Sequence, residues 1–579
     1  SKQATQKDPT ISIDGKTALL GDKVYYRVNI DASRLTDTAY KVWRLGMTDD
    51  YDQEYLTLDA KHVEILDETG RDRTGEFNIQ DKDGVLYAFA KTVDTQIPAT
   101  GETVPGDPQP DDLKAYSEKS DKDYDPLKDP SIDQSLLGHT YQVVMPMTVT
   151  KVKDGHTVEN TATQVTNDKR DKTNTVTNPL KEINPKKDAT VQVGGDSIDG
   201  KSVYLNHTFL YRLDSSILPP DRAYQTVTDW GGTDQLATEY DQYLGNWAVY
   251  ASRDLYRDGQ VLAARGEKIA GIAGSGFDSS KFGGNLFTVD ADDNGKVTVN
   301  ATQTYLDLVS ADNEHEAGWV LYLQCKRIAV ADEVPNTWTE TINGQPRESN
   351  KVVTKTPDMT PSIHLEKVDT PTLKQDGQEQ ADRDDSKQAL KMDADNIGIT
   401  FIITNTSKTD PATGDGAWYK ASDLNLADST IVGDAHVDMD SLTYPADWDT
   451  LVLKPGESVS VTGTLKGVKE GDTHTDRAIV TGTPLVECAP SNGDPFNDKT
   501  DGGEDTDPEY STGDVTEIDG KQLCADTQTA SNTDDWNGYR AKPLASTGTA
   551  VLGLAGGALA VLLAGGSLLV FRKRHYAQG

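Results

Sequence analysis

The chain has 579 residues and a formal net charge of −37, from 57 Lys and Arg against 94 Asp and Glu. This length exceeds what one hydrophobic core supports, and it predicts about three or four domains. The excess of acids argues against nucleic acid or anionic lipid as a partner. A mean hydropathy of −0.60 with 35% hydrophobic residues is compatible with strand-rich domains whose sheets expose one face to water.

The first part of the chain contains an internal repeat of domain size. Residues 13–17 (IDGKT) recur as residues 198–202 (IDGKS), and residues 24–28 recur as residues 209–213 at the same spacing. A repeat of this length indicates tandem domains instead of a solenoid. We therefore expect two related domains in this part of the chain, within an all-β fold.

Short apolar or alternating runs, bounded by Gly, Asp, Asn and Pro, predict antiparallel strands within both copies. Examples are residues 141–145, 246–250 and 320–330. The predicted domain limits are 1–183 and 184–358.

A third sandwich of different sequence is predicted over residues 359–490. Its strands are expected at 397–405, 459–465 and 478–482. Residues 491–543 are rich in Asp, Gly, Asn, Thr and Ser, which predicts an acidic segment that is either flexible or pinned by a disulfide.

Three cysteines bear on the compartment. Cys325 lies in an apolar run and is expected to be a buried free thiol. Cys488 and Cys524 are either joined in a disulfide after export or both free, and we favour the disulfide. No apolar secretion signal follows Ser1, so we expect the sequence to be the carboxy-terminal part of a longer polypeptide.

The last 36 residues, 544–579, have three parts in a fixed order. An apolar run at 549–571 is long enough to cross a bilayer core as a helix, and the basic residues 572–574 follow it. The run is preceded by a pentapeptide, Leu544-Ala545-Ser546-Thr547-Gly548.

That order resembles the cell-wall sorting signal of sortase substrates. The resemblance implies cleavage between Thr547 and Gly548 and transfer of the threonine carboxyl to peptidoglycan. Ala545 departs from the commonest motif, which has Pro there, although an L-A-x-T-G variant occurs among Gram-positive surface proteins. An ordinary carboxy-terminal membrane anchor is the alternative.

Several blocks resemble the carboxy-terminal domains of the antigen I/II family of surface adhesins. They are residues 183–188, 217–221, 322–330 and 349–352 in the second copy, with residues 49–52 and 146–149 in the first. The family implies DEv-IgG-like sandwiches, each cross-linked by an intramolecular Lys-Asn isopeptide bond.

Carried over by position, the resemblance implies two bonded pairs, Lys7 with Asn174 and Lys187 with Asn350. A buried acid must polarise the Asn carboxamide while the Lys amine attacks in its neutral form. The expected acids are Asp49 in the first copy and Asp229 in the second, where Asp234 is the alternative.

The third domain is similar to bacterial Ig-like repeats with a Thr-Asn-Thr signature, here at residues 404–406. Such repeats serve as spacers. Lys367 could pair with Asp476, which stands where related domains often have Asn; the alternative is that both are exposed.

Other chemistry has little support in the sequence. Residues 290–295 mimic the first half of a calcium loop, but Ala301 stands where the bidentate Glu belongs, so a plain acidic turn is favoured. The family implies bound metal, structural Ca²⁺, whose ligands cannot be assigned here. No zinc spacing and no paired nucleophile and base occur, so the protein is not expected to be an enzyme or to require a cofactor.

These features predict the wall-proximal stalk of an adhesin anchored by sortase to peptidoglycan on the extracellular surface. A missing amino-terminal region would bind a host or bacterial surface glycoprotein. The alternatives are a pilin-like shaft subunit, which would need a second reactive Lys motif, and the anchor part of a wall-bound enzyme.

Overall fold

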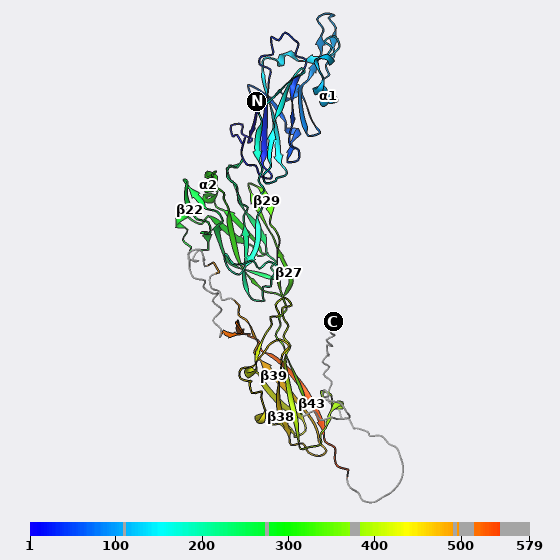
Figure 1. The fold of residues 1–579 in the computed structure, drawn as a ribbon, viewed down its shortest axis with the longest axis vertical. Helices are drawn as coiled ribbons and strands as arrows, with labels where there is room; N and C mark the ends of the chain where they lie inside the picture. The colour runs from blue at the N-terminus through cyan, green and yellow to red at the C-terminus, as the bar shows by residue number, and fades with distance from the viewer. Residues whose placement is uncertain (108–111, 273–276, 371–382, 490–494, 497–514, 545–579) are drawn as a thin grey trace, which may run out of the picture.

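The computed structural model describes residues 1–107, 112–272, 277–370, 383–489, 495–496 and 515–544. Within these residues, three β-sandwich domains follow one another along an extended molecule, coloured from blue through green to red in Figure 1. The α-helices of the described part are short, α1 (Leu113–Glu118) and α2 (Gln303–Ala311). The expectation of tandem β-sandwiches is therefore confirmed.

The first domain packs two antiparallel sheets against each other. One sheet consists, in spatial order, of β1 (Lys2–Thr5), β2 (Lys23–Asp31), β12 (Thr140–Val149) and β4 (Leu56–Leu58), with β5 (Glu64–Asp67) also paired to β12. The other consists of β15 (Lys169–Lys172), β14 (Ala162–Thr166), β3 (Leu45–Asp50), β7 (Val85–Ala90) and β6 (Phe77–Lys82). A separate ladder joins β13 (Thr157–Asn160) to β16 (Val176–Pro179).

Alternation along the strands decides which face enters the core. In β12, Tyr141, Val143, Met145 and Met147 are all buried, because every second side chain points to the same face of a strand. Their burial against the opposite sheet forms the core of the first domain.

The second domain repeats this arrangement. One sheet consists of β17 (Lys186–Thr190), β18 (Thr208–Asp214), β26 (Trp319–Arg327), β20 (Asp241–Ala251) and β23 (Lys268–Gly271). The other consists of β24 (Phe287–Ala291), β25 (Lys296–Ala301), β19 (Trp230–Gln235), β28 (Trp338–Ile342) and β29 (Gln345–Glu348). Two further ladders join β21 (Leu255–Arg257) to β22 (Gln260–Ala263), and β27 (Ala331–Asn336) to β30 (Val352–Thr356).

The third domain has four strands in each main sheet. One sheet consists of β31 (Ile363–Asp369), β33 (Asn396–Asn405), β38 (Ser458–Lys466) and β36 (His436–Val437). The other consists of β32 (Leu390–Lys391), β43 (Ala530–Tyr539), β39 (Thr473–Gly482) and β35 (Asn425–Val432). The strands expected at 397–405, 459–465 and 478–482 lie in β33, β38 and β39.

A small sheet of β40 (Leu485–Glu487), β42 (Lys521–Ala525) and β41 (Thr516–Ile518) lies beside the main sandwich. Cys488, the residue after β40, forms a disulfide with Cys524 in β42, and the two Cα atoms are 4.9 Å apart. Cys325 is a buried free thiol in the second domain.

The strand β43 corrects the predicted limits of the third domain. Residues 491–543 were expected to form only a flexible or disulfide-pinned segment, yet β43 is an inner strand of the sandwich, paired with β39 along its whole length. Its sequence, ASNTDDWNGY, is polar apart from a few positions. Trp536 is fully buried in the core, and that one large side chain provides most of the strand's hydrophobic contact.

Short backbone contacts join the first domain to the second. The Thr17 amide donates to the Asp221 carbonyl at 2.8 Å, and the Ala223 amide donates to the Thr17 carbonyl at 2.7 Å. Ala223 also packs into the core of the first domain. The two sandwiches are therefore joined by backbone hydrogen bonds between the domains.

The second and third domains meet through side chains. Ser202 Oγ donates to Asp410 Oδ2 at 2.8 Å, and the Tyr204 hydroxyl donates to Asp415 Oδ2 at 2.9 Å. In Figure 1 the three domains are arranged nearly end to end.

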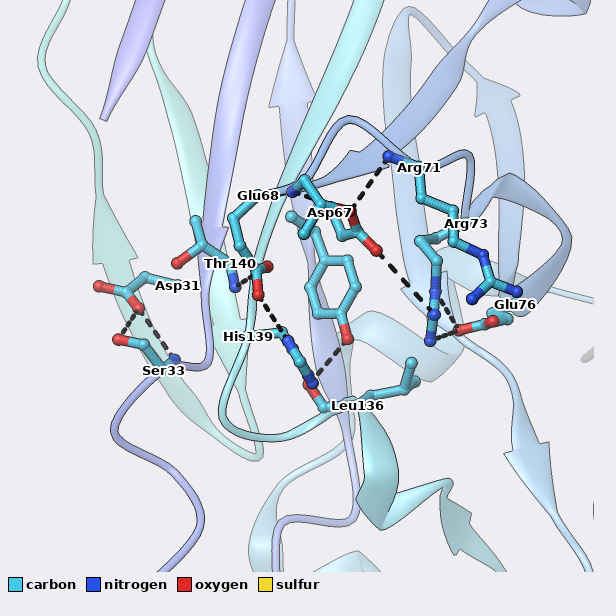
Figure 2. A network of polar contacts seen from close by, with 12 residues as sticks. Asp31, Ser33, Asp67, Glu68, Arg71, Arg73, Glu76, Leu136, His139 and Thr140 are labelled. Atoms are coloured by element: carbon cyan, nitrogen blue, oxygen red, sulfur yellow. Dashed lines mark hydrogen bonds and ion pairs between the residues drawn. The ribbon is translucent and has the colours of Figure 1, made fainter.

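A polar network holds the turn that follows β5 in the first domain (Figure 2). Arg73 lies 2.7 Å from the carboxylate of Glu76 and 4.0 Å from that of Asp67. Next to Asp67, Glu68 contacts His139 Nδ1 at 2.6 Å and accepts from the Thr140 amide at 3.2 Å. These contacts tie the turn to the beginning of β12.

Candidate functional site

The first domain contains a buried lysine that contacts a buried acid. Lys2 begins β1, and its Nζ forms an ion pair with Asp49 Oδ2 on β3 of the opposite sheet. Neither side chain is exposed to solvent. The Lys2 amine also lies 4.9 Å from the centre of the Tyr26 ring.

Burial changes the protonation of both groups. It lowers the pKa of Lys2 to about 8, although Asp49 opposes this change. Burial also raises the pKa of Asp49, against the effects of Lys2 and Asn160. The low-polarity surroundings therefore shift both groups toward their neutral forms, a nucleophilic amine and a carboxyl that can donate a proton.

The amide of Asn160 completes this cluster. Asn160 ends β13 and stands two residues before Ala162, which pairs with Asp49 across the sheet. The Asn160 amide lies close enough to Asp49 to lower the pKa of that carboxyl, which places the amide beside the acid. Its side chain is buried, and neither its Nδ2 nor its Oδ1 has a hydrogen-bond partner among the described residues.

The second domain contains the same cluster. Lys187 Nζ forms an ion pair with Asp234 Oδ2, and the side chains are 0% and 1% exposed. The amine lies 4.6 Å from the centre of the Tyr211 ring. Burial lowers the pKa of Lys187 and raises the pKa of Asp234.

Asn336 has the position of the carboxamide in this second cluster. It stands two residues before Trp338, which pairs with Asp234. The Asn336 side chain is buried, and within the described part of the chain both of its amide atoms are without a hydrogen-bond partner.

Such a cluster can form an amide bond. A neutral Lys amine attacks the Cγ of the neighbouring Asn, the acid donates a proton to the carboxamide and takes one from the amine, and ammonia leaves. Two unsatisfied polar atoms in a dry core are costly in a purely structural role, because each has lost its hydrogen bonds to water.

The structure contradicts the predicted pair of Lys7 and Asn174. Lys7 is exposed at the surface. Asn174 Oδ1 accepts from the Lys2 backbone amide at 2.8 Å, and its Nδ2 donates to the Lys2 carbonyl at 2.9 Å. Asn174 therefore holds the backbone of β1 and does not face the Lys2 amine.

The predicted partner of Lys187 is wrong for the same reason. Asn350 exchanges two hydrogen bonds of 2.9 Å with the backbone of Lys187. The acid Asp229 is exposed and accepts from the Gly344 amide at 3.1 Å. Asp234, the alternative left open by the sequence, is the acid that contacts the lysine.

The internal repeat contained the information that identifies the buried lysine of the first domain and the acid of the second. The spacing that relates residues 13–17 to residues 198–202 also relates Lys2 to Lys187 and Asp49 to Asp234. Lys7 was matched instead because it precedes an Asp, as Lys187 does. No comparable signal pointed to the asparagines, because their position depends on strand register.

The third domain brings Lys367 and Asp476 together, as the sequence suggested. Lys367 Nζ lies 2.6 Å from Asp476 Oδ2 and also 2.6 Å from Asp428 Oδ2. Asp428 was not among the predicted residues. The lysine is therefore held between two carboxylates instead of one acid and one amide.

Of the predicted sorting signal, Leu544 lies within the described residues and is 97% exposed. The other four residues, Ala545, Ser546, Thr547 and Gly548, and the expected membrane span at 549–571 lie outside them. In the part of the chain that the structure describes, no helix is both long and apolar enough to cross a membrane.

The structural Ca²⁺ implied by the resemblance stays a prediction. No cluster of three or more His, Cys, Asp or Glu side chains suited to a metal ion occurs in the described ranges. We therefore assign no residue to metal binding.

Comparisons with known proteins agree with this architecture. Residues 1–180 match the model of the cell surface antigen I/II C2 terminal domain, and residues 184–357 match that of the cell surface antigen C-terminus. The aggregation substance of Enterococcus faecalis (strain ATCC 700802 / V583) is 29% identical over 327 residues. This match covers 56% of the chain but 21% of that relative, so the chain spans about a fifth of the relative's length.

Two solved structures are also similar. The C terminal domain of the Streptococcus agalactiae AgI/II polypeptide BspA is 18% identical, with a TM-score of 0.43, covering 61% of this chain and 99% of that one. The C-terminal domain of the Streptococcus pyogenes antigen I/II-family protein AspA is 21% identical, with a TM-score of 0.45, covering 61% of this chain and 98% of that one.

The tandem sandwiches and the two matched models define a cell surface antigen of a non-enzymatic class, located at the extracellular surface. More narrowly, the chain belongs to the antigen I/II family, and residues 1–357 are two of the carboxy-terminal domains of such an adhesin.

Proposed function

We propose that this chain is a covalently stapled stalk that holds an adhesive region away from the bacterial wall. The observation that carries the proposal is the buried Lys-Asp-Asn cluster, which occurs once in each of the two antigen I/II domains. The extended row of sandwiches supports a spacer role, because domains arranged nearly end to end add reach (Figure 1).

In this proposal the staples are amide bonds from Lys2 to Asn160 and from Lys187 to Asn336. Asp49 and Asp234 transfer the protons. Each bond joins the first strand of a domain to a strand near its end, so a pulling force passes through the bond and bypasses the chain between. The staple then serves mechanical and proteolytic resistance.

Mass spectrometry of the purified chain tests the staples. We expect each bond to lower the mass by one ammonia, and proteolysis to release Lys2 and Asn160 in one branched peptide. Lys2→Ala should restore one ammonia and leave the second-domain bond in place. Lys7→Ala is the matched control, because Lys7 is exposed and should leave both bonds intact.

Recovery of Lys2, Asn160, Lys187 and Asn336 only in linear peptides would refute the staples. A bond found instead between Lys2 and Asn174 would refute the assignment of the partner while keeping the chemistry.

We further propose that the chain is joined to peptidoglycan through Thr547 by a sortase. The five-residue motif, the apolar run and the basic end support this, since all three occur in the order that sortase substrates require. Thr547→Ala should release the protein from the wall fraction or leave it in the membrane, while Ser546→Ala, at a variable position of the motif, should remain wall-bound. Equal wall attachment of both variants would contradict the proposal.

The receptor is proposed to be a host or bacterial surface glycoprotein, bound by a region outside this sequence. The name of the enterococcal relative, aggregation substance, supports attachment to neighbouring cells. Binding of purified chain to such cells, compared with a longer chain that includes preceding sequence, would locate the adhesive region.

A further inference from the structure

The third domain has its own buried lysine, although its sequence differs from that of the first two. Lys367 lies on β31, the first strand of the domain, and its side chain crosses the core to the opposite sheet. Lys367 is fully buried, and its Nζ is 2.6 Å from both Asp428 on β35 and Asp476 on β39. The ring of Phe401 lies 5.4 Å from the amine, as tyrosine rings do in the other domains.

Strand register gives the two acids different roles. In the first two domains the candidate Asn stands two residues before the residue that pairs with the acid. In the third domain Asp476 pairs with Thr430, and Asp428 stands two residues before Thr430 on the neighbouring strand. By this spacing along the chain, Asp476 corresponds to Asp49 and Asp234, and Asp428 corresponds to the asparagines.

The contacts of the two acids agree with this equivalence. Asp476 is fully buried, its Oδ1 has no hydrogen-bond partner among the described residues, and its Oδ2 also lies 3.0 Å from His474 Nε2. The Oδ1 atoms of Asp49 and Asp234 are unpartnered in the same way. Burial raises the pKa of Asp428, which shifts this carboxyl toward its protonated form.

We propose that the third domain forms an amide bond between Lys367 Nζ and Asp428 Cγ, with Asp476 as the proton-transfer group. The nitrogen lone pair attacks the carboxyl carbon of protonated Asp428, and the bond from that carbon to its hydroxyl breaks. The leaving hydroxyl takes a proton that Asp476 relays from the amine, so one water is released and no oxidant or energy source is needed.

This inference rests on the covalent chemistry proposed for the first two domains, but its product differs in origin. A Lys-Asn bond releases ammonia, whereas a Lys-Asp bond releases water. The residue that bonds to Lys367 is also different: it is Asp428, whereas the sequence suggested Asp476 as the partner.

Peptide mapping of the full chain tests the inference. We expect a branched peptide that joins Lys367 to Asp428 and whose mass is one water below the sum of its two linear parts. Fragmentation of that peptide assigns the bonded acid. Asp428→Asn should give a branched peptide of identical mass, now one ammonia below its parts, because both reactions leave the same amide.

Two further variants distinguish the bonded residue, Asp428, from the proton-transfer group, Asp476. Asp428→Ala should abolish the bond, and Asp476→Asn should lower its yield several-fold while the disulfide of the same domain still forms. Linear peptides for both Lys367 and Asp428 in the wild-type chain would overturn the inference, and so would a branch at Asp476. Because the same digest reports on Lys2 and Lys187, failure in the third domain alone is distinguishable from failure of all staples.

Discussion

At the scale of single residues, buried charges in the second domain are of two kinds. Asp241 accepts from Arg327 at 2.7 Å and from the Tyr211 hydroxyl at 2.7 Å, so the pair is well satisfied. Asp234 contacts Lys187 but has one oxygen without a partner in the described part of the chain. A satisfied pair is suited to stability, whereas an unsatisfied one retains groups that can react.

We expect Arg327→Met to destabilise the second domain by about 3–5 kcal/mol, because it leaves the buried Asp241 carboxylate unpaired. Hydrogen exchange of peptides from β26 in the full chain measures the change. The control is Arg253→Met in the same domain, which removes an ion pair between the partly exposed side chains of Arg253 and Glu316 and should cost less than about 1 kcal/mol. Equal effects of the two variants would show that the buried Asp241 carboxylate does not need Arg327 to keep the second domain stable.

The protonation of Lys2 gives a prediction about pH. In Asn160→Ala no bond can form, and Lys2 keeps a folded pKa of about 8, well below its unfolded value. Between these two values the unfolded chain binds more protons than the folded one, so stability rises with pH, by up to roughly 3 kcal/mol. Below pH 8 this contribution is absent.

Hydrogen exchange of β1 and β2 across that pH range measures this effect. The double variant Lys2→Met with Asn160→Ala is the control and should lack the rise, as should a wild-type chain that carries the proposed bond, in which Lys2 would not titrate. A rise of equal size in the double variant would assign the effect to other groups.

At the scale of secondary-structure elements, position in a sheet outweighs local composition. The polar strand β43 lies between β32 and β39 in the third domain, with Trp536 buried at its centre. The Trp536 indole donates to Asp369 Oδ1 at 2.7 Å, which links β43 to β31. One aromatic anchor and a complete ladder of backbone hydrogen bonds hold this strand in place.

We expect Trp536→Ala to destabilise the third domain by about 3–5 kcal/mol, through the cavity it leaves and the lost partner of Asp369. Trp536→Phe should cost less, because it keeps most of the packing and loses the hydrogen bond. Thermal unfolding of the full chain, with hydrogen exchange of β39 to identify the domain, measures both. A third domain unaffected by Trp536→Ala would mean that β43 is dispensable.

At the scale of the whole molecule, three sandwiches in a row bear the same pulling force. The domain that unfolds at the lowest force therefore decides when the molecule lengthens. Contacts such as those of Thr17 with Asp221 and Ala223 join neighbouring domains without a covalent bond. The proposed staples act inside domains and do not restrain these contacts between domains.

Single-molecule pulling on the chain ends should detect the staples directly. In the wild-type chain the residues between Lys2 and Asn160 should stay hidden from the force. Lys2→Ala should let the first domain extend, adding about 3.3–3.6 Å for each residue released. Lys7→Ala should behave like the wild type, and a wild-type first domain that extends fully would contradict the staple.

The sequence alone determined the all-β class, the two repeated domains and most strands, because side-chain alternation and turn residues are local signals. It also indicated Lys187, Asp49 and the paired cysteines. Only the tertiary structure decided that Asn160 and Asn336 lie beside the buried acids, that Asp428 is next to Lys367, and that β43 completes the third domain. Those relations depend on the register between strands distant in the chain, and register is set by packing of the whole core.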